Sequence, residues 1–437
     1  MTSKAQSDTK SLSAPSSYLI LQGLGSPFFK MLGKNLGAEG SPVHKVNFCG
    51  GDWWFSGHAI NHRFNGKLEV LSDFYHDLIK QHSITTIIVF GDCRPIHKIA
   101  RKVADDLGLK LWVFEEGYIR PGFITCELGG TNDLSALPRS AASVNARATD
   151  IIEDVNTAEP WRAVNPMPRR VRMDFAHHLW NILLKPFYFR YRTHRPDSMM
   201  AEIRGWLGRI RRKIEHRNIN AALVKRYENT DKPFFMVPLQ LNSDFQIREH
   251  SDYDGVLDFI RETIASFARH APKGTLLMFK SHPLDNGMID YRNYIAMAAM
   301  KHNIEGRIDY LEGGNLEKYL ERALGIILIN STVAFAALAK AKPLKVMGRA
   351  LFNMAGLADP RNLDKFWKTP PMPDPALIDN FLKVVRTDSQ IRGDLFTKAG
   401  IEIATKAASV RIQADTEALN PQTSNVNHLQ ELEEQRA

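Results

Sequence analysis

The sequence predicts an α/β protein whose two Rossmann-like halves face each other across a cleft. Short apolar runs rich in Val, Ile, Leu and Phe alternate with longer stretches in which apolar residues recur at helical spacing. Such alternation is typical of parallel sheets covered by helices. It occurs in two series, separated by a basic and mostly helical stretch, and a chain of 437 residues is long enough for two domains.

The first series predicts a parallel sheet whose strands end in polar side chains. The predicted strands are 18–22, 43–48, 85–90 and 110–114, and the predicted helices are 28–36, 68–82 and 96–107. The turn Gly23-Leu-Gly-Ser-Pro27 predicts an open phosphate or sugar site at the start of the first helix. Asp92 and Arg94 follow the third strand, and Glu115 and Glu116 follow the fourth. Ligands of open α/β sheets bind at the carboxyl ends of the strands, so these side chains predict an active-site edge.

The middle of the chain predicts a linker followed by basic helices. Apolar residues recur at helical spacing opposite a basic face: Ile203, Trp206, Leu207, Ile210 and Ile214 against Arg204, Arg209, Arg211, Arg212 and Lys213. Aromatic and basic residues also mix between His177 and Arg195. Two interpretations remain open: helices that approach an anionic membrane surface, or helices that pack on the core with a solvated face.

The second series predicts another parallel sheet. Its predicted strands are 234–237, 275–279, 308–311, 325–329 and 344–347, and its predicted helices are 259–270, 291–301, 316–323 and 333–341. The first of these strands leads into a dense polar loop that contains Gln240, Asp244 and Arg248. Asp244 is either a catalytic carboxylate at a strand end or the cap of the next helix, and the residues alone leave both interpretations open.

An anion site is predicted in the second half. Asn330-Ser-Thr332 lies between a buried strand and a helix start, where Ser and Thr either bind a phosphate or simply cap the helix. Lys280 and His282 follow another strand and would neutralise a leaving phosphate. P-loop, metalloprotease, calcium-loop and nucleophile-elbow motifs are absent from the sequence, so we expect neither a metal nor another cofactor. Two carboxylate sites beside an anion pocket suit glycosyl transfer.

Composition narrows the partners and the compartment. The net charge of +9 favours an anionic partner, but helix-turn-helix, RRM and zinc motifs are missing, which argues against nucleic acid. The three cysteines, Cys49, Cys93 and Cys126, form no C-x-x-C pair and fit a reducing compartment. Apolar runs are too short for a membrane span, and the first sixteen residues lack the apolar core of a signal peptide.

Several motifs together resemble one family. They are Gly91-Asp-Cys-Arg-Pro95, Phe114-Glu-Glu-Gly-Tyr-Ile-Arg-Pro121, Pro238-Leu-Gln240, Asp244-Phe-Gln-Ile-Arg248, Ser266-Phe-Ala-Arg-His-Ala-Pro272, Lys280-Ser-His-Pro-Leu-Asp285, Asn330-Ser-Thr-Val333, Phe366-Trp367 and Ser389-Gln-Ile-Arg-Gly393. In this order they resemble the capsule polysaccharide biosynthesis and export proteins that act as β-Kdo transferases. The resemblance runs from about residue 17 to residue 396. Two motifs depart from the family pattern: Ala334-Phe335 stands where Gly and a smaller or aliphatic residue are expected, and Lys-Ser-His-Pro replaces the more usual Lys-His-His-Pro or Lys-x-His-Pro.

The resemblance implies a metal-independent, retaining glycosyltransferase of the GT-B type that uses CMP-Kdo. It implies Asp244 as the nucleophile and Glu115 or Glu116 as the acid/base, of which we favour Glu115. The residues expected to bind CMP are Lys280, His282, Asn330, Ser331 and Thr332. From their charge, Arg120 and Arg248 are expected to contact the sugar carboxylate. Further substrate contacts are expected from Gln240, Asp92 and Arg94.

The resemblance also implies an acceptor, a location and a domain layout. The acceptor would be a (lyso)phosphatidylglycerol lipid at the inner membrane, on which the enzyme starts a poly-Kdo linker beside other capsule biosynthesis and export proteins. The alternative is a non-catalytic export component that binds the glycolipid. The expected parts are a disordered leader (1–16), an acceptor-side domain (17–130), a linker with basic helices (131–230), a CMP-sugar domain (231–397) and a helix with a disordered tail (398–437).

Overall fold

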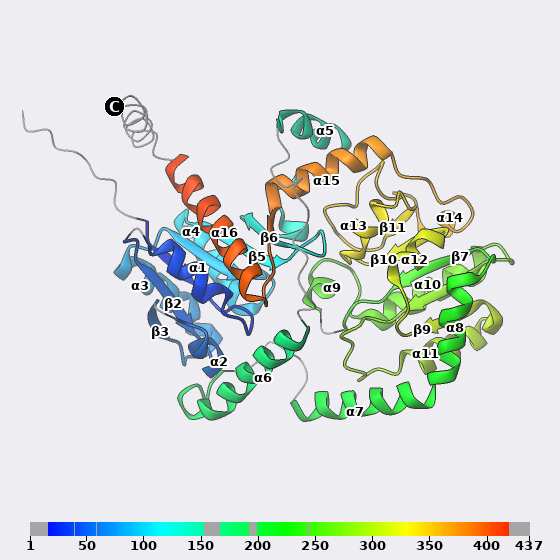
Figure 1. The fold of residues 1–437 in the computed structure, drawn as a ribbon, viewed down its shortest axis with the longest axis horizontal. Coiled ribbons are helices and arrows are strands. Elements are labelled where there is room, and N and C mark those ends of the chain that lie inside the picture. The colour runs from blue at the N-terminus through cyan, green and yellow to red at the C-terminus, as the bar shows by residue number, and fades with distance from the viewer. Residues whose placement is uncertain are drawn as a thin grey trace, which may run out of the picture.

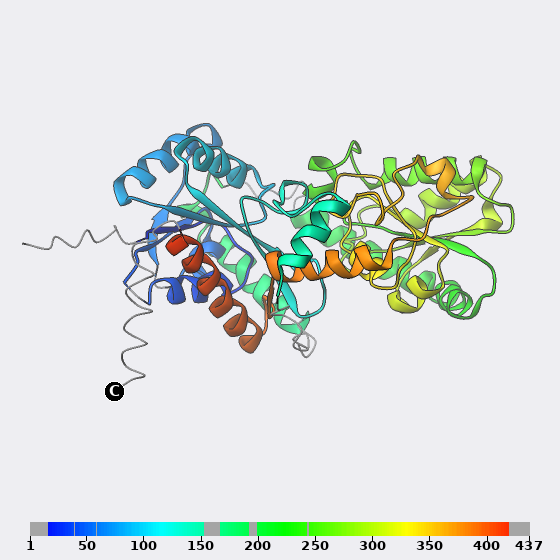
Figure 2. The ribbon, with the colours of Figure 1, turned by 90° about the horizontal axis from the view of Figure 1, so that it is seen from above.

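A computed structural model describes residues 16–38, 40–57, 59–152, 167–191, 199–242 and 244–418. It contains two β-sheets, each covered by helices, which form two lobes side by side (Figure 1, Figure 2). The first lobe is built around a seven-stranded sheet and the second around a five-stranded sheet. The two-lobed, GT-B-like α/β architecture predicted from the sequence is confirmed. Of the expected leader (1–16), the structure describes only residue 16. Of the expected C-terminal helix and tail (398–437), it describes residues 398–418.

The sheet of the first lobe is parallel except at one edge. Its order is β12-β6-β5-β4-β1-β2-β3. The strands are β1 (Tyr18–Ile20), β2 (Val43–Asn47), β3 (Ile60–Arg63), β4 (Thr86–Phe90), β5 (Lys110–Glu116), β6 (Phe123–Leu128) and β12 (Gln390–Arg392). Strand β6 runs antiparallel to β5, and β12 runs antiparallel to β6. Strand β5 continues past the expected end at Phe114, so Glu115 and Glu116 are its last two residues.

Helices cover both faces of this sheet. They are α1 (Phe28–Leu36), α2 (Gly50–Trp54), η1 (Leu68–Val70), α3 (Leu71–His82) and α4 (Pro95–Leu107), with a short η2 (Asn132–Leu134) after β6. One apolar layer joins α1 to α16 (Lys398–Ala418), and the other joins α3 and α4 to the opposite face. Cys49, Cys93 and Cys126 are buried free thiols, as the absence of paired spacing predicts.

The sheet of the second lobe is entirely parallel, in the order β11-β10-β7-β8-β9. Its strands are β7 (Phe234–Pro238), β8 (Leu276–Lys280), β9 (Ile308–Leu311), β10 (Gly325–Leu328) and β11 (Leu344–Val346). Its helices are α9 (Phe245–Glu249), α10 (Val256–His270), α11 (Tyr291–Lys301), η4 (Glu305–Arg307), α12 (Leu316–Arg322), α13 (Val333–Leu338) and α14 (Leu363–Phe366). Each strand is an apolar run buried on both sides, which is why the sequence predicted all five.

The chain returns to the first lobe near its C-terminal end. Helix α15 (Pro375–Ser389) packs on the core of the second lobe, and the next residue, Gln390, starts β12 in the first sheet. Gln390 is fully buried, accepts a hydrogen bond from the Tyr118 backbone (2.9 Å) and donates one to Thr125 (3.1 Å). The expected domain boundary at residue 397 is therefore wrong, because residues 390–396 complete the sheet of the first lobe.

The two departures from the family pattern have different outcomes in the fold. Phe335 on α13 stacks on Tyr118 of the first lobe (ring centroids 5.4 Å, interplanar angle 8°) and on Phe381 of α15 (5.9 Å). The large side chain at this position therefore fills the apolar layer where the lobes meet. For Ser281, in the second motif, the buried side chain gives no comparable explanation.

The middle of the chain forms α5 (Ala141–Asp150), α6 (Met167–Leu183), η3 (Lys185–Phe187), α7 (Met199–Glu215) and α8 (Arg217–Asn229). Helix α5 packs on α15, α6 packs on α2, and α8 contacts β9. On α7 the apolar stripe faces solvent: Leu207, Ile210 and Ile214 are 62%, 53% and 70% exposed. Core packing of this stripe, one of the two open interpretations, is therefore wrong. Among the described residues, no helix is both long and apolar enough to cross a membrane.

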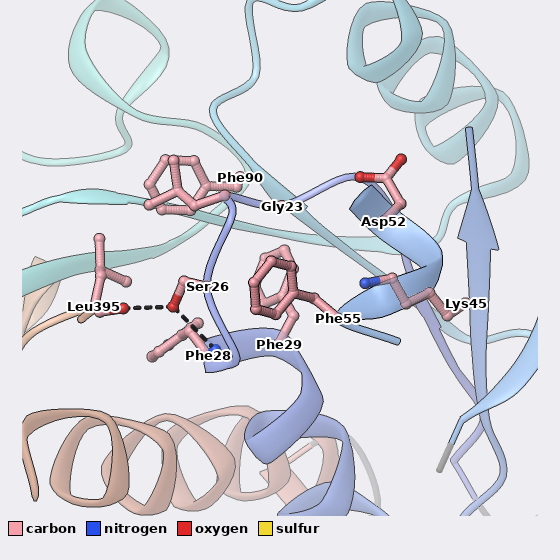
Figure 3. A pocket seen from close by; sticks show the side chains of 10 residues that line it. Gly23, Ser26, Phe28, Phe29, Lys45, Asp52, Phe55, Phe90 and Leu395 are labelled. Carbon is pink, nitrogen blue, oxygen red and sulfur yellow. Dashed lines mark hydrogen bonds between the residues drawn. The ribbon is translucent and has the colours of Figure 1, made fainter. Parts of the chain in front are cut away.

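The glycine turn after β1 is closed rather than open (Figure 3). Ser26 donates a hydrogen bond to the carbonyl oxygen of Leu395, and the Phe28 backbone donates to the Ser26 hydroxyl (3.2 Å). The small pocket beside this turn is lined by four phenylalanines and other apolar or small residues, with Lys45 and Asp52 at one side. The expected phosphate or sugar site at the start of α1 is therefore wrong, because the returning chain covers it.

Two adjacent glycines in α2 let α6 approach the first lobe closely. A Cβ atom at Gly50 would overlap the carbonyl oxygen of Trp180, and one at Gly51 would overlap the ring of His177. The Gly51 backbone donates a hydrogen bond to the Asn181 side chain (2.7 Å), and Trp180 stacks on Trp54 (4.5 Å, 17°). The position of α6 against the first lobe therefore requires glycine at both positions.

We expect Gly50→Val to displace α6 from the first lobe, because the new side chain meets backbone that cannot move alone. Limited proteolysis should then cut within residues 167–191 faster than in the unchanged protein. The matched control is Gly274→Val, since a Cβ at Gly274 meets no atom within 4 Å. Equal cleavage rates in the two variants would show that α6 is held by other contacts.

Candidate active site

A cleft of about 1150 Å³ lies between the lobes, at the carboxyl ends of strands from both sheets. The strands β4 and β5 contribute from the first lobe, β7, β8 and β10 contribute from the second, and α6 and α7 close one side. Ten of the thirteen predicted site residues line it: Arg94, Glu115, Glu116, Arg120, Gln240, Asp244, His282, Asn330, Ser331 and Thr332. In this arrangement, the polar residues that follow the strands of both sheets face a common cleft.

Asp244 enters the cleft as the N-cap of α9. Its carboxylate oxygen Oδ1 accepts a hydrogen bond from the Gln246 backbone N–H (3.0 Å), which is the capping bond considered from the sequence. The same side chain also lines the cleft, so capping and a position in the site occur together. Burial raises the pKa of Asp244, while the capping bond acts in the opposite direction by stabilising the ionised form.

Glu115 is a partly buried carboxyl group held by two amide donors. The Asn132 side chain donates to Oε2 (3.1 Å), and the Gln246 side chain donates to Oε1 (3.2 Å). Burial raises the pKa of Glu115 to about 8, and the charges of Asp92 and Asp244 add to the shift. A carboxyl group with this pKa exchanges its proton near neutral pH, as an acid/base residue must.

The neighbouring Glu116 has the opposite environment. Arg120 and Arg170 each place a guanidinium nitrogen 2.9 Å from one of its carboxylate oxygens. Burial alone would raise the pKa of Glu116, but the two arginines outweigh burial and hold the pKa below its ordinary value. Glu116 therefore stays ionised at neutral pH, and the contrast with Glu115 favours Glu115 as the acid/base residue.

A small amide network fixes α9 in the cleft. Gln240, at the end of β7, donates to the Asn330 side chain (2.8 Å) and accepts from the Asn330 backbone (3.3 Å). Asn330 in turn donates to the carbonyl oxygen of Gln246 (2.8 Å). Gln240 and Asn330 line the cleft, but their side chains already hold the strand ends and α9 together. Gln240 and Asn330 therefore have a structural role in holding α9, and their contact with substrate stays a prediction.

The predicted anion residues divide into two groups. Ser331, Thr332 and His282 line the cleft, and burial together with Arg120 lowers the pKa of His282 to about 4. Lys280 instead ends β8 as a buried residue whose ammonium donates to the Ser281 carbonyl (3.3 Å), and it does not line the cleft. Helix α13 after Thr332 has six residues rather than the nine expected.

Three predicted substrate residues have other partners. Arg248 does not line the cleft and donates to the Asp254 carbonyl (3.2 Å), so its expected contact with the sugar carboxylate stays a prediction without support from this arrangement. Asp92 is buried beneath the cleft, where it pairs with Arg101 (2.9 Å) and accepts from the Thr131 backbone (3.0 Å). Arg94 does line the cleft, and donates to the Gly23 carbonyl (3.2 Å).

The sequence analysis did not identify three residues that contact the carboxylates of the site: Gln246, Asn132 and Arg170. Gln246 was part of the polar loop, two residues after Asp244, but nothing in its spacing indicated that its side chain reaches the other lobe. Asn132 and Arg170 lie in the stretch expected to be a linker. A positive φ of 53° at Asn132 turns the chain after β6 and brings its amide to Glu115.

Comparisons with known proteins agree on a family. The profile of the family described as "Capsule polysaccharide biosynthesis protein" matches residues 85–396. The capsule polysaccharide modification protein LipB of Neisseria meningitidis serogroup A is 32% identical over 393 residues, which cover 89% of this chain and 93% of LipB. The capsule polysaccharide export protein KpsS of Escherichia coli is 34% identical over 379 residues, or 86% of this chain and 95% of KpsS.

Among solved structures, the β-Kdo 2,7 transferase of Thermosulfurimonas dismutans KpsC aligns with a TM-score of 0.40 and 16% identity, covering 90% of this chain and 97% of that one. The assignment to a family rests on the sequence matches, which extend over most of the chain, and the profile match includes both carboxylate motifs of the cleft. The chain therefore belongs to the capsule polysaccharide biosynthesis protein family.

Proposed function

We propose that this protein is a retaining, metal-independent glycosyltransferase that transfers β-Kdo from CMP-Kdo to a phosphatidylglycerol-type lipid. The observation that carries the proposal is the position of Gln246. Its backbone N–H donates to Asp244 and its side chain donates to Glu115, so one residue holds carboxylates from both lobes. A retaining transfer needs such a pair, one carboxylate as nucleophile and the other as acid/base.

In the first step, the ionised Asp244 attacks the anomeric carbon of Kdo. The bond from that carbon to the CMP phosphate breaks, and the electron pair leaves with the phosphate. Arg120 and Arg170 lie on the same side of the cleft as Glu116, and their positive charge favours both the sugar carboxylate and the departing phosphate. Ser331 and Thr332 supply hydroxyl groups for the nucleotide on the opposite lobe.

In the second step, the acceptor hydroxyl attacks the same carbon from the other face. The ester bond to Asp244 breaks, and the proton of the hydroxyl passes to Glu115. The ionised Asp244 contributes to the raised pKa of Glu115, and esterification removes that charge. Formation of the adduct therefore shifts the pKa of Glu115 downwards and favours its ionised, basic form when the acceptor reacts.

The surface formed by α6, η3 and α7 supports a membrane-bound acceptor. Helices α6 and α7 lie along the same edge of the molecule, one beneath each lobe (Figure 1). Large apolar side chains on α6 and α7 are exposed there: Phe175 (69%), Ile182 (55%), Leu207 (62%) and Ile214 (70%). Basic residues such as Arg172 and Arg211 accompany them. Apolar and basic side chains on surface helices suit the interface of an anionic bilayer, which would place the protein on the cytoplasmic side of the inner membrane.

Not all of the basic face is free for lipid. Arg209 donates to the Pro283 carbonyl (3.1 Å) and to the carbonyl of Asp285, and Arg212 donates to the Gly287 carbonyl. These two arginines hold α7 against the loop after β8, beside the cleft. The membrane contact is therefore assigned to the apolar stripe and to the outward cations.

The transfer proposal predicts a covalent intermediate. Incubation with CMP-Kdo generated in place should add the mass of one Kdo to a peptide that contains Asp244. The adduct should be absent in Asp244→Asn. In Glu115→Gln it should accumulate, since departure of CMP needs no acid but the second step has lost its base, and transfer should fall about 100-fold or more. Intact-protein mass spectrometry measures both. Transfer without any adduct would overturn Asp244 as nucleophile, and folded protein with neither would favour the non-catalytic export component.

The raised pKa of Glu115 predicts a pH-dependent stability difference. The unfolded chain ionises this carboxyl near its ordinary pKa of 4.5, whereas the folded protein keeps the proton up to about 8. Stability due to this group is therefore complete below about 4.5 and is lost as the pH rises to about 8. The melting temperature of Glu115→Gln relative to the unchanged protein should thus increase across this range and then level off.

Glu116→Gln is the matched control for that measurement. Its pKa is lowered, so its ion pairs contribute stability above the unfolded pKa, and the variant should be less stable at neutral pH. Parallel melting curves for Glu115→Gln and the unchanged protein at every pH would contradict the assignment of Glu115.

The membrane proposal predicts that the exposed apolar residues of α6 and α7 control lipid binding. The variant Phe175→Glu/Ile182→Glu/Leu207→Glu/Ile214→Glu should lose binding to phosphatidylglycerol vesicles in a flotation assay. Met297→Glu/Ile403→Glu changes exposed apolar residues of α11 and α16 and should bind as before. Equal flotation of the two variants would overturn this surface.

A further inference from the structure

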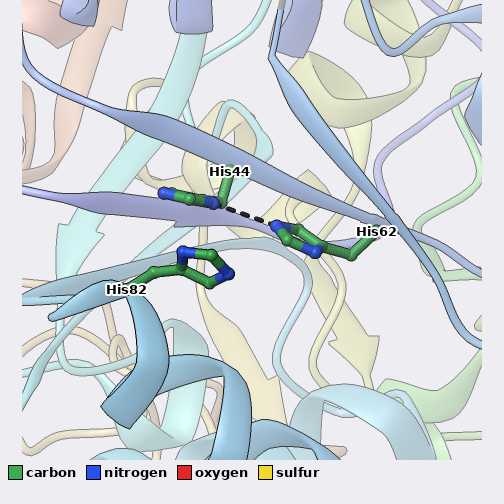
Figure 4. A group of neighbouring side chains, drawn as sticks. All are labelled: His44, His62 and His82. Carbon is green, nitrogen blue, oxygen red and sulfur yellow. Dashed lines mark hydrogen bonds between the residues drawn. The ribbon is translucent and has the colours of Figure 1, made fainter.

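Three histidines meet at the edge of the first sheet, away from the cleft (Figure 4). His44 is the second residue of β2, His62 belongs to the edge strand β3, and His82 is the last residue of α3. In the parallel register Val46 pairs with His62, so His44 and His62 project from the same face of the sheet. That face is the one that α3 covers, which brings His82 to the other two.

Their ring nitrogens are close enough to share one ion. One ligand nitrogen from each histidine lies within 4.8 Å of the others. His44 Nδ1 and His62 Nε2 are 2.9 Å apart, and the ring of His82 lies 4.4 Å from that of His44 between centroids. Three nitrogens bound to zinc at about 2.0–2.1 Å in a tetrahedral arrangement are separated by ~3.3 Å. Small side-chain rotations therefore suffice to convert the cluster into a three-ligand site.

We propose that His44, His62 and His82 bind one divalent transition-metal ion, with zinc as the first choice. The inference is independent of the proposed transferase function. All three donors are imidazole nitrogens, a set that suits zinc, copper, nickel and cobalt and does not suit magnesium or calcium. His62 and His82 are only partly buried, so the fourth coordination position is open to water.

The surroundings also favour a cation. His82 ends a twelve-residue helix, and the carboxyl end of a helix carries a partial negative charge. Within the part of the chain that the structure describes, none of the three histidines forms an ion pair with a carboxylate that would hold it as a cation. At most one proton lies between His44 Nδ1 and His62 Nε2, which form a hydrogen bond. A metal ion would replace that proton and accept the lone pairs of both nitrogens and of a nitrogen of His82.

The metal would stabilise an exposed edge of the fold. Strand β3 is the outermost strand next to β2, and three of its four residues are exposed. A bound ion would connect this strand to β2 and to the helix that covers both. None of the three histidines lines the cleft, so the ion would take no part in transfer.

The test uses the full chain without a polyhistidine tag, stripped with a chelator and titrated with Zn²⁺ by calorimetry and with Co²⁺ by visible absorption. We expect one equivalent to bind, tetrahedral Co²⁺ bands to appear, and Zn²⁺ to raise the melting temperature. His62→Ala and His82→Ala should each weaken binding at least ~10-fold, because loss of a group that only supports a ligand already weakens metal binding about 10–100-fold.

The matched control is His76→Ala, which removes another histidine of α3 that contacts the Ser72 carbonyl and lies outside the cluster. It should bind zinc like the unchanged protein. Absence of a saturable equivalent in the unchanged protein would overturn the proposal. So would an equivalent that survives unchanged in both His62→Ala and His82→Ala, since the ion would then lie elsewhere.

Discussion

The hydrogen bonds to the Glu115 carboxylate constrain the whole arrangement. A carboxylate withdrawn from water is destabilising unless donors contact it, and for the partly buried Glu115 one donor comes from each lobe. Asn132 follows β6 of the first sheet, and Gln246 belongs to α9 after β7 of the second. Satisfying Glu115 therefore requires α9 to lie against the end of β5. The Gln240–Asn330 amide pair fixes α9 from behind, and Tyr118 stacked on Phe335 fills the apolar contact beside it.

Alternation along β5 explains why two adjacent glutamates behave so differently. Successive residues of a strand point to opposite faces, so Glu115 and Glu116 meet different neighbours although they share a strand end. For Glu115, burial together with the charges of Asp92 and Asp244 raises the pKa to about 8 and leaves the proton in place near neutral pH. Glu116 faces two guanidinium groups, which lower its pKa and keep it ionised. One short sequence thus supplies both a proton-exchanging group and a fixed negative charge that orients arginines in the cleft.

The sequence predicted the parts of this structure that depend on local patterns. Apolar runs identified all five strands of the second sheet and β1, β2, β4 and β5 of the first, but not the internal strand β6, and ten of the predicted site residues line the cleft. Strand β3 was missed because Ile60-Asn-His-Arg63 lies at a solvent-exposed edge and has no apolar run. Strand β12 was missed because it has three residues and pairs with a strand more than 260 positions earlier. The side-chain partners of Glu115 and Glu116 depend on such distant pairing, so spacing could not reveal Asn132 or Arg170.

The late return of the chain to the first lobe affects how the protein folds during synthesis. Strand β6 is an edge until Gln390–Arg392 pairs with it, and the apolar face of α1 is uncovered until α16 arrives. A ribosome makes the first lobe's other strands long before these segments emerge. An unpaired strand edge and an uncovered apolar face are the features that chaperones recognise and that aggregation exploits. Completion of the first lobe must therefore wait for nearly the whole chain, and the second lobe can form its core first.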